Sequence, residues 1–396
     1  MLGFSIATAL PVKGPGCLSF KTVISYDVVQ NHGSLAQLLN PTCNFLSIVQ
    51  SRVLRCEEAS VSRSVTPLTK REPEPVLKMA KAFAPATIAN LGPGFDFLGC
   101  AVEGLGDVVC AEISESVPPG EILIQKVTGD GGRLSYNQKK NCAGIAGKAT
   151  MELLGVTSFG LSLSLFKGLP LGSGLGSSAA SAAAAAVAVN ALFGNALTKA
   201  QLVQAGLISE AVVSGYHADN VAPSLMGGFV LIRSYSPLHL IPLNFPLNKD
   251  LFFVLVTPVF EAPTKKMRAV LPNTIDMRQH VSNCSQGAAL VTAILEGDIA
   301  LFGNAMSSDS IVEPLRSPFI PGMAAVKLAA IQAGAHGCTI SGAGPTAVAV
   351  TDGIEQGKAI GASMKAAFLE GGNLLSSASV YKLDRRGAKV VETSQN

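Results

Sequence analysis

The pattern of apolar and polar positions becomes regular from Val76 onward and predicts a mixture of strands and helices. Residues 161–166 alternate leucine with serine, as in a half-buried strand, whereas residues 141–154 have helical spacing that ends at Gly155. Further apolar runs predict strands at 76–84, 108–113, 121–127, 229–232, 252–257, 346–350 and 379–383. Helices are expected at 177–193, from Thr198, and at 279–306, 322–333 and 357–369. Because strands and helices do not alternate strictly, this order favours an α+β fold.

The length of 396 residues predicts two domains rather than one. A proline-containing stretch places the boundary between residues 78–245 and 246–396; its prolines are Pro237, Pro242 and Pro246. The most apolar stretch, residues 179–193, is dominated by alanine and interrupted by Ser181 and Asn190. It falls short of the roughly 18 uninterrupted apolar residues of a membrane helix, so we expect a core helix and no membrane association.

The net charge of +3 belongs entirely to residues 1–56, which hold four basic residues and one acidic residue. The remaining chain therefore has no excess charge to attract nucleic acid or anionic lipid, and neither is expected as a partner. Five of the eight cysteines follow residue 56, and they form no CxxC pair. Buried thiols in a reducing compartment are expected rather than a disulfide framework or a zinc site.

Residues 1–56 are rich in serine and threonine and nearly free of acidic residues, which resembles an organellar transit peptide. The segment Val53–Cys56 is similar to the end of a plant plastid leader, so we expect cleavage near residue 56 and a location in the chloroplast stroma. An unrelated N-terminal tail is the alternative. Residues 57–77, with Glu, Ser and Pro, are expected to form a linker.

The strongest local signal is the glycine-rich loop before the predicted helix 177–193. Gly172, Gly174 and Gly176 allow tight turns and leave backbone amides unobstructed. Ser177 and Ser178 then open the helix, whose N-terminus offers free N–H groups and partial positive charge to a phosphate. The loop matches neither a Walker A sequence nor G-x-G-x-x-G. It therefore predicts an anion site of another kind, with a purely structural turn as the alternative.

This loop resembles the ATP loop of the GHMP small-molecule kinases. Residues 84–96 (APATIANLGPGFD) and 339–346 (TISGAGPT) match two further family motifs in the expected order. Within the family, the block 84–96 and the residues 217–223 (HADNVAP) are similar to those of homoserine kinases. The resemblance implies an N-terminal ribosomal-S5-domain-2-like domain and a C-terminal ferredoxin-like domain, with the site between them.

The resemblance also implies an activity. The enzyme would transfer the γ-phosphate of ATP, with Mg²⁺, to the hydroxyl of L-homoserine, giving O-phospho-L-homoserine for threonine biosynthesis, and a homodimer is the family expectation. The ATP contacts implied are Pro170, Leu171, Gly172, Ser173, Gly174, Leu175, Gly176, Ser177, Ser178, Ala179 and Ala180. Asn141 is a further candidate, for the adenine.

An amino-acid substrate needs groups for its ammonium and its carboxylate, and arginine suits the carboxylate. The positions that match the family's substrate contacts are Asn90, Asp96, His217, Thr264, Arg268 and Arg316. Read without the resemblance, Asn90 could cap a turn and Asp96 a helix, and the arginines could be solvated surface residues. Arg316 is expected in a proline-bounded loop.

For catalysis, Glu210 and Ser178 match the family's magnesium-binding residues, and apolar neighbours of Glu210 predict that its carboxylate is buried or faces a cleft. Asn220 stands where mevalonate kinases carry a catalytic Asp. We therefore expect the hydroxyl to attack directly, aligned by Asn220, without Asp219 as a base. A mevalonate-type GHMP kinase and a non-catalytic ATP sensor are the alternatives.

Overall fold

The computed structural model describes residues 72–213 and 215–395. The transit peptide predicted for residues 1–56, and residues 57–71 of the predicted linker, lie outside the described residues. From Glu72 onward the chain is held by hydrogen bonds: the Glu72 carboxylate accepts from the amides of Thr157 and Ser158, each at 2.7 Å. These amides lower the pKa of Glu72 to about 2.

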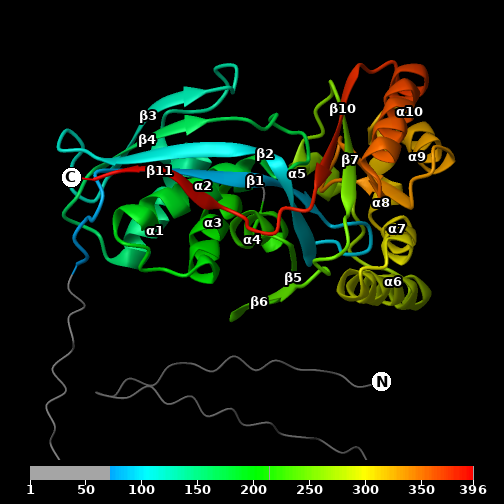
Figure 1. Ribbon diagram of the computed structural model, residues 1–396, viewed down its shortest axis with the longest axis horizontal. Coiled ribbons are helices and arrows are strands. Elements are labelled where there is room, and N and C mark those ends of the chain that lie inside the picture. Colours follow the sequence, from blue (N-terminus) through cyan, green and yellow to red (C-terminus); the bar gives the residue numbers. More distant parts are fainter. Residues whose placement is uncertain (1–71, 214, 396) are drawn as a thin grey trace, which may run out of the picture. The chain divides into compact units, whose positions relative to one another are not determined.

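Within the described residues, seven strands form the larger sheet, in the order β11-β1-β2-β4-β3, with β5 paired to β2 and β6 to β5 (Figure 1). Among these described strands, the β3–β4 pair alone is parallel. The strands are β1 (Met79–Ala89), β2 (Leu98–Ile113), β3 (Ile122–Thr128), β4 (Leu161–Phe166), β5 (Phe229–Tyr235), β6 (Leu238–Leu243) and β11 (Lys389–Ser394).

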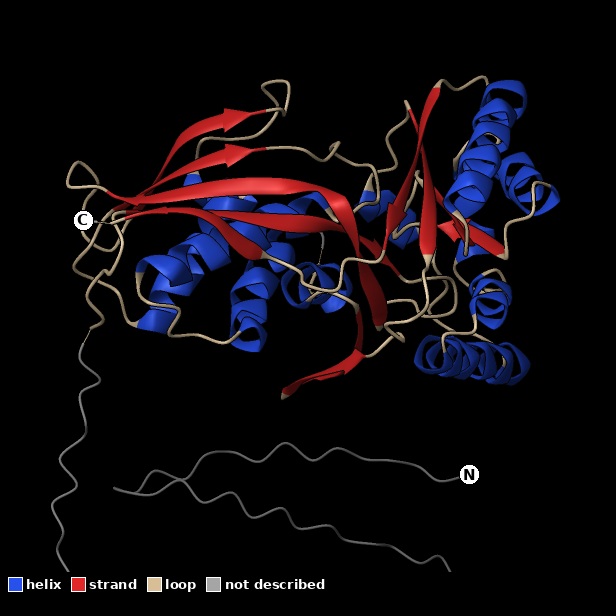
Figure 2. Cartoon of the chain, in the orientation of Figure 1, coloured by secondary structure: helices blue, strands red, loops and turns tan. Residues whose placement is uncertain are grey.

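Helices cover one face of this sheet (Figure 2). They are α1 (Cys142–Leu154), preceded by the 3-10 helix η1 (Gln138–Lys140), α2 (Ser177–Leu192), α3 (Lys199–Val213) and α4 (Ala218–Met226). The alanine-rich α2 packs against β1 and β2 and against the other three helices, and every residue from Ala179 to Leu192 is buried. A helix enclosed on all sides needs no polar face, which explains why its sequence is apolar all round.

A second sheet of four strands has the order β10-β7-β9-β8. Its strands are β7 (Phe252–Pro258), β8 (Gly337–Ile340), β9 (Ala347–Thr351) and β10 (Ser376–Lys382). The helices of this part of the chain are α5 (Thr264–Ala269), α6 (Met277–Glu296), α7 (Ile299–Met306), α8 (Glu313–Arg316), η2 (Ser317–Phe319), α9 (Met323–Gln332) and α10 (Ile354–Gly372), of which α7, α9 and α10 pack against the strands of the second sheet.

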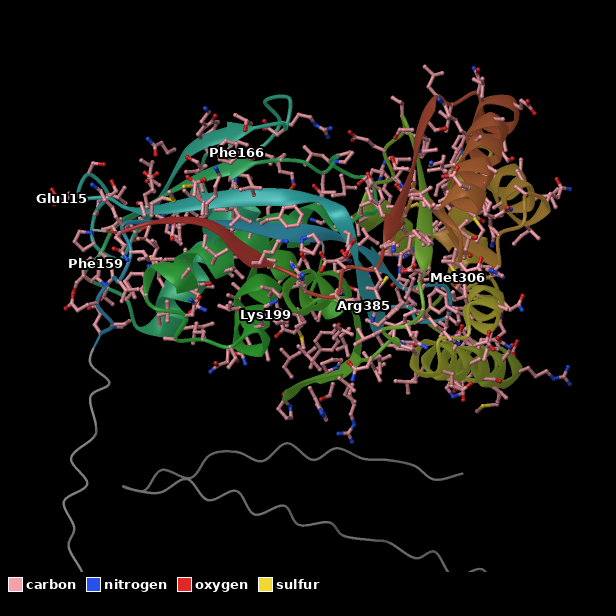
Figure 3. All side chains as sticks on the ribbon, viewed as in Figure 1. Glu115, Phe159, Phe166, Lys199, Met306 and Arg385 are labelled. Atoms are coloured by element: carbon pink, nitrogen blue, oxygen red, sulfur yellow. The ribbon has the colours of Figure 1, made fainter. Side chains whose placement is uncertain are left out.

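The alternation of side chains along β7 divides the hydrophobic core in two. Phe253 and Leu255 belong to the larger core, whereas Val254 and Val256 belong to a smaller core that includes residues of α9 and α10. Successive side chains of a strand point to opposite faces, so a strand buried on both faces reads as a continuous apolar run. Side chains fill the space between each sheet and its helices (Figure 3).

The α+β class is confirmed, and most predicted elements are present. The expected helix 279–306 is wrong as a single element, because Gly297 adopts φ 66° and ends α6, and Asp298 caps α7. Residues 379–383 are not the last strand, since β11 follows and pairs with β1. Arg385, labelled in Figure 3, holds the connection to β11 by donating to the carbonyl oxygens of Phe245 and Pro246.

The described residues contain no helix that is both long enough and apolar enough to span a bilayer.

Candidate active site

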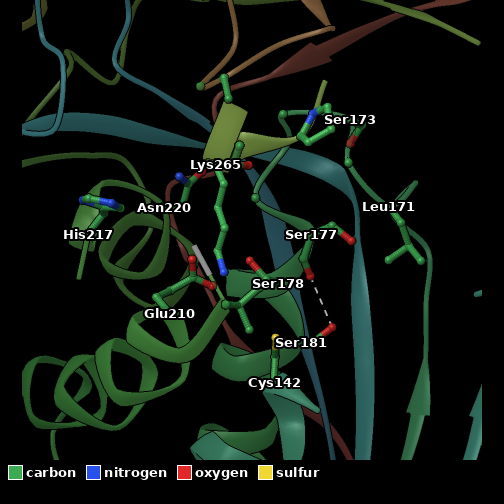
Figure 4. A pocket seen from close by; sticks show the side chains of 18 of the residues that line it. Cys142, Leu171, Ser173, Ser177, Ser178, Ser181, Glu210, His217, Asn220 and Lys265 are labelled. Atoms are coloured by element: carbon green, nitrogen blue, oxygen red, sulfur yellow. Dashed lines mark hydrogen bonds between the residues drawn. The ribbon is translucent and has the colours of Figure 1, made fainter. Parts of the chain in front are cut away.

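A cavity of about 460 Å³ lies where the glycine-rich loop, the first turn of α2, and residues of α3, α4 and α5 meet (Figure 4). The turn between β8 and β9, which carries the third family motif, contributes Gly342 and Ala343 to its wall. All six predicted substrate residues and both predicted catalytic residues line this cavity. Segments more than 250 residues apart in the sequence therefore share one site.

The glycine-rich loop touches the turn of the third motif directly. Gly174 has φ 81°, and a Cβ at this position would lie 2.4 Å from the carbonyl oxygen of Ser341. The Ser341 hydroxyl donates to the Gly174 carbonyl oxygen at 2.7 Å. The third motif therefore lies in direct contact with the glycine-rich loop, and only glycine fits at residue 174.

The N-terminus of α2 is arranged as an anion site. Gly176, in the left-handed region at φ 66°, caps the helix and provides no side-chain acceptor for its first amides. Gly176, Ser177 and Ser178 all line the cavity. Amides of a first helical turn that lack an acceptor carry partial positive charge and suit a phosphate.

A buried ion pair that the sequence analysis missed connects the glycine-rich loop to α2. The ammonium of Lys167 pairs with the Asp107 carboxylate and donates to the Ser177 carbonyl at 2.8 Å and to the Ser181 hydroxyl at 2.9 Å. The other Asp107 oxygen accepts from the amides of Gly168 and Leu169. The two charged side chains are 1% and 0% exposed, so this pair fixes the loop to α2 in a low-dielectric environment.

Two of the predicted substrate-binding residues, Asp96 and Arg268, form an ion pair with each other. Arg268 donates to both oxygens of Asp96, at 2.9 and 2.7 Å, and this pairing raises the pKa of Arg268. The ring of Phe95 lies 5.1 Å from the guanidinium of Arg268 and 5.0 Å from that of Arg316. The aromatic face thus brings two arginines together beside one carboxylate.

Arg316 is 2% exposed and lies in the short helix α8 rather than in the loop expected from its sequence. It donates to the carbonyl oxygens of Met267, at 2.9 Å, and Gly342, at 3.1 Å. Burial, and then the charge of Arg268, lowers its pKa to about 10, so it stays protonated at neutral pH. A buried guanidinium without its own carboxylate is prepared to receive an anion.

Asn90 fulfils the turn-capping role that the sequence left open, and it also lines the cavity. It adopts φ 74°, its Oδ1 accepts from the Asp96 amide at 3.1 Å, and its Nδ2 donates to Gly342. Asp96 does not cap a helix, because β2 follows it. The imidazole of His217 lies 3.8 Å from the Asp96 carboxylate.

Asn220 is oriented by a buried threonine. The hydroxyl of Thr87, on β1, donates to Asn220 Oδ1 at 2.7 Å. With that oxygen engaged, the amide presents its NH₂ group as a donor. Thr87 is fully buried, so the orientation of Asn220 is fixed from the sheet side.

Two buried carboxyl groups line the same cavity. Glu210, on α3, is 4% exposed, which confirms the expectation from its apolar neighbours. Asp219 is 3% exposed, and its Oδ1 has no hydrogen-bond partner among the described residues. Burial, with the charges of Asp96 and Glu210, raises the pKa of Asp219 to about 7.

Some residues implied for ATP do not line the cavity. Leu175, Ala179 and Ala180 are core residues, and Pro170 is exposed. Asn141 lines the cavity, but its Oδ1 caps α1 by accepting from Ala143 and its Nδ2 donates to Ser135. The structure therefore shows Asn141 as a helix cap at the cavity wall.

The sequence analysis also missed Phe95 and Lys265, which line the cavity. Phe95 stands inside the block 84–96, and its position directly after Gly92-Pro93-Gly94 was the available signal. Lys265 adjoins two predicted substrate residues, Thr264 and Arg268, and looked like an ordinary surface cation.

The fold and the phosphate-loop geometry define a GHMP kinase. The family models "GHMP kinases N terminal domain" and "GHMP kinases C terminal" match residues 141–228 and 290–369. Homoserine kinase of Arabidopsis thaliana is 64% identical over 341 residues, which is 86% of this chain and 91% of that protein. Homoserine kinase of Chloroherpeton thalassium is 39% identical over 80% of this chain and all of the relative.

Among solved structures, a homoserine kinase from Cytophaga hutchinsonii superposes with a TM-score of 0.74 at 42% identity, covering 79% of this chain and 98% of that one. A mevalonate kinase of L. major shares the fold, with a TM-score of 0.59 at 19% identity and similar coverage, 78% and 98%. The chain belongs to the homoserine kinase family.

Proposed function

We propose that this chain transfers the γ-phosphoryl group of ATP to the side-chain hydroxyl of L-homoserine, giving ADP and O-phospho-L-homoserine for threonine biosynthesis. The observation that carries the proposal is the shared cavity. It joins a helix N-terminus suited to phosphate with a paired carboxylate and two guanidinium groups suited to an amino acid. The names of the relatives agree with this substrate.

An amino acid fits the Asp96–Arg268 pair because it carries both charges. Its ammonium would contact Asp96, and its carboxylate would contact Arg268 and Arg316, so each new contact matches an opposite charge. Thr264 and His217 lie at the same wall and offer further polar contacts. A hydroxy acid such as mevalonate lacks the ammonium, and a sugar lacks both charges.

In the transfer step, the substrate hydroxyl oxygen forms a bond to the γ-phosphorus while the bond from that phosphorus to the β–γ bridging oxygen breaks. The electron pair of the broken bond stays on ADP, and the hydroxyl proton passes to an oxygen of the γ-phosphoryl group. The Asn220 amide, held by Thr87, orients the hydroxyl. Positioning and electrostatics supply most of the catalysis in such a mechanism.

Asp219 does not serve as the base in this mechanism. Its pKa of about 7 already reflects burial and two neighbouring carboxylates. The negative charge of a bound triphosphate raises the pKa of a nearby carboxyl further. Both effects favour the protonated carboxyl, which cannot accept the hydroxyl proton, so the proposed mechanism leaves Asp219 out of the proton transfer.

Glu210 and Ser178 would hold Mg²⁺ together with the phosphates. The described residues contain no group of three or more His, Cys, Asp or Glu side chains placed to bind a metal. One buried carboxylate and one hydroxyl beside a phosphate site nevertheless fit Mg²⁺, which commonly combines one or two carboxylates with substrate phosphates. When bound, Mg²⁺ neutralises charge on the β- and γ-phosphates.

The proposal includes a plastid location, which the composition of residues 1–56 and the similarity to a plant relative support. N-terminal sequencing of the native protein should begin near residue 57, and an intact Met1 would contradict this. A homodimer is also proposed, and light scattering of the purified protein tests it.

The decisive experiment measures ADP release from ATP and Mg²⁺ with L-homoserine, mevalonate and galactose in parallel. Turnover is expected with homoserine alone. ADP release with mevalonate but not with homoserine would assign the site to another GHMP kinase, and no release with any of them would support the sensor alternative.

A further inference from the structure

The cavity contains a lysine whose role neither the sequence motifs nor the comparisons describe. Lys265 belongs to the first turn of α5, between Thr264 and Arg268, and it lines the cavity. Its neighbour Lys266 is also exposed but does not line the cavity. Lys265 therefore faces the cavity, whereas its neighbour Lys266 faces solvent.

The segment before α5 lies against the glycine-rich loop. A Cβ placed on Gly172 would lie 3.8 Å from Cγ of Glu261, so a side chain at this position would reach van der Waals contact with the segment before α5. The carboxylate of Glu261 in turn pairs with Arg133, in the segment after β3, at 2.6 Å. The segment before α5 therefore lies close to the glycine-rich loop proposed to receive the phosphates.

Figure 4 shows the Lys265 side chain extending into the cavity with its ammonium directed toward Glu210 and Ser178. Those two residues are the ones proposed to hold Mg²⁺. A phosphate bound by the N-terminus of α2 would therefore come within reach of a cation from α5.

Only some of the cavity's basic residues are held in ion pairs among the described residues, and Lys265, like Lys140 and Arg316, is left available for a ligand. Lys167 is committed to Asp107, and Arg268 is committed to Asp96. Among residues 72–213 and 215–395, no ion pair or hydrogen bond is recorded for the Lys265 ammonium. A cation that is directed into a phosphate-binding cavity and is not held in an ion pair is suited to an anionic ligand.

We propose that Lys265 contacts the terminal phosphate of the bound nucleotide and stabilises the negative charge that develops on it during transfer. The inference rests on the proposed kinase function and adds a catalytic residue to it. The terminal phosphate is assigned, rather than the α-phosphate, because α5 also carries Thr264 and Arg268, the proposed contacts of the acceptor. Lys265 thus stands between the acceptor and the phosphate loop.

The test compares Lys265→Ala, Lys265→Arg and the matched control Lys266→Ala. Lys265→Ala should lower kcat about 100-fold, the loss typical of removing one preorganised electrostatic group, with the KM for homoserine nearly unchanged. Lys265→Arg keeps the charge and should recover most of kcat. Lys266→Ala should match the unmodified enzyme.

Calorimetry supplies a readout besides turnover. Lys265→Ala should weaken the affinity for a non-hydrolysable ATP analogue about tenfold while leaving the affinity for ADP unchanged, because ADP lacks the terminal phosphate. A kcat equal to that of Lys266→Ala, or an equal loss of affinity for ADP and for the analogue, would overturn the assignment. If the unmodified enzyme fails to phosphorylate homoserine, the proposed function fails, and the difference between the two nucleotides still tests Lys265.

Discussion

Replacing Asp219 by asparagine tests the electrostatics of the cavity and the mechanism together. Asp219 is 3% exposed, and its pKa rises from an ordinary value of 3.8 to about 7, first because of burial and then because of Asp96 and Glu210. A folded-state pKa above the unfolded one means that the folded protein binds this proton more tightly. The stabilisation of the folded state by this bound proton is fully present below about pH 4, and it is lost as the pH rises to about 7.

The magnitude follows from the difference between 3.8 and about 7. At about 1.4 kcal/mol per pH unit, ionised Asp219 costs about 4 kcal/mol of unfolding free energy above pH 7, relative to a neutral side chain. Asparagine has nearly the same shape and no charge. Asp219→Asn should therefore gain stability relative to the unmodified protein between pH 4 and 7, with a constant difference above pH 7.

Urea unfolding of both proteins at intervals from pH 4 to 8 measures this difference. Asp250→Asn, which removes an exposed carboxylate paired with Lys382, is the control and should show no such pH-dependent gain. A stability difference that does not change with pH would refute the burial argument.

The same variant tests the proton transfer. Because the proposed mechanism does not use Asp219 as a base, Asp219→Asn should keep most of kcat. A collapse of kcat, together with loss of an ionisation near pH 7 in the kcat/KM profile, would identify Asp219 as the general base.

Three further predictions concern the phosphate end of the site. Glu210→Gln should abolish turnover while leaving the circular dichroism spectrum unchanged, and retained turnover would contradict its role. Gly174→Ala introduces a Cβ 2.4 Å from a carbonyl oxygen and should weaken binding of an ATP analogue, whereas Gly131→Ala, also at positive φ but in open space, should not. Lys167→Met leaves the Asp107 carboxylate buried without its partner and should lower the free energy of unfolding by about 3–5 kcal/mol. An unchanged denaturation midpoint would contradict this prediction.

Several features of the fold could be predicted from the sequence because they depend on neighbouring residues. The glycine-rich turn followed by Ser177 and an alanine helix is local, and helix α2 begins at that serine. Gly155 ends α1 in the left-handed region, as its position after the apolar period indicated. The end of the chain was predicted less well, since β11 exists by pairing with β1, more than 300 residues away.

The chemistry of the candidate site shows the same division. Motif spacing nominated Asp96, Glu210 and Arg268, and these residues do line one cavity. Spacing gave no sign that Asp96 and Arg268 pair with each other across 172 positions of sequence. It also gave no sign that Lys265, rather than Lys266, enters the cavity.

The sequence by itself determined the segments that carry the phosphate loop and the acceptor residues, because backbone turns and helix starts are set by the residues beside them. The tertiary structure alone decided which charges are paired, which are buried and which remain available to a ligand. Ion pairing and desolvation depend on distance and on the surrounding dielectric, and both arise only when segments remote in the chain pack together.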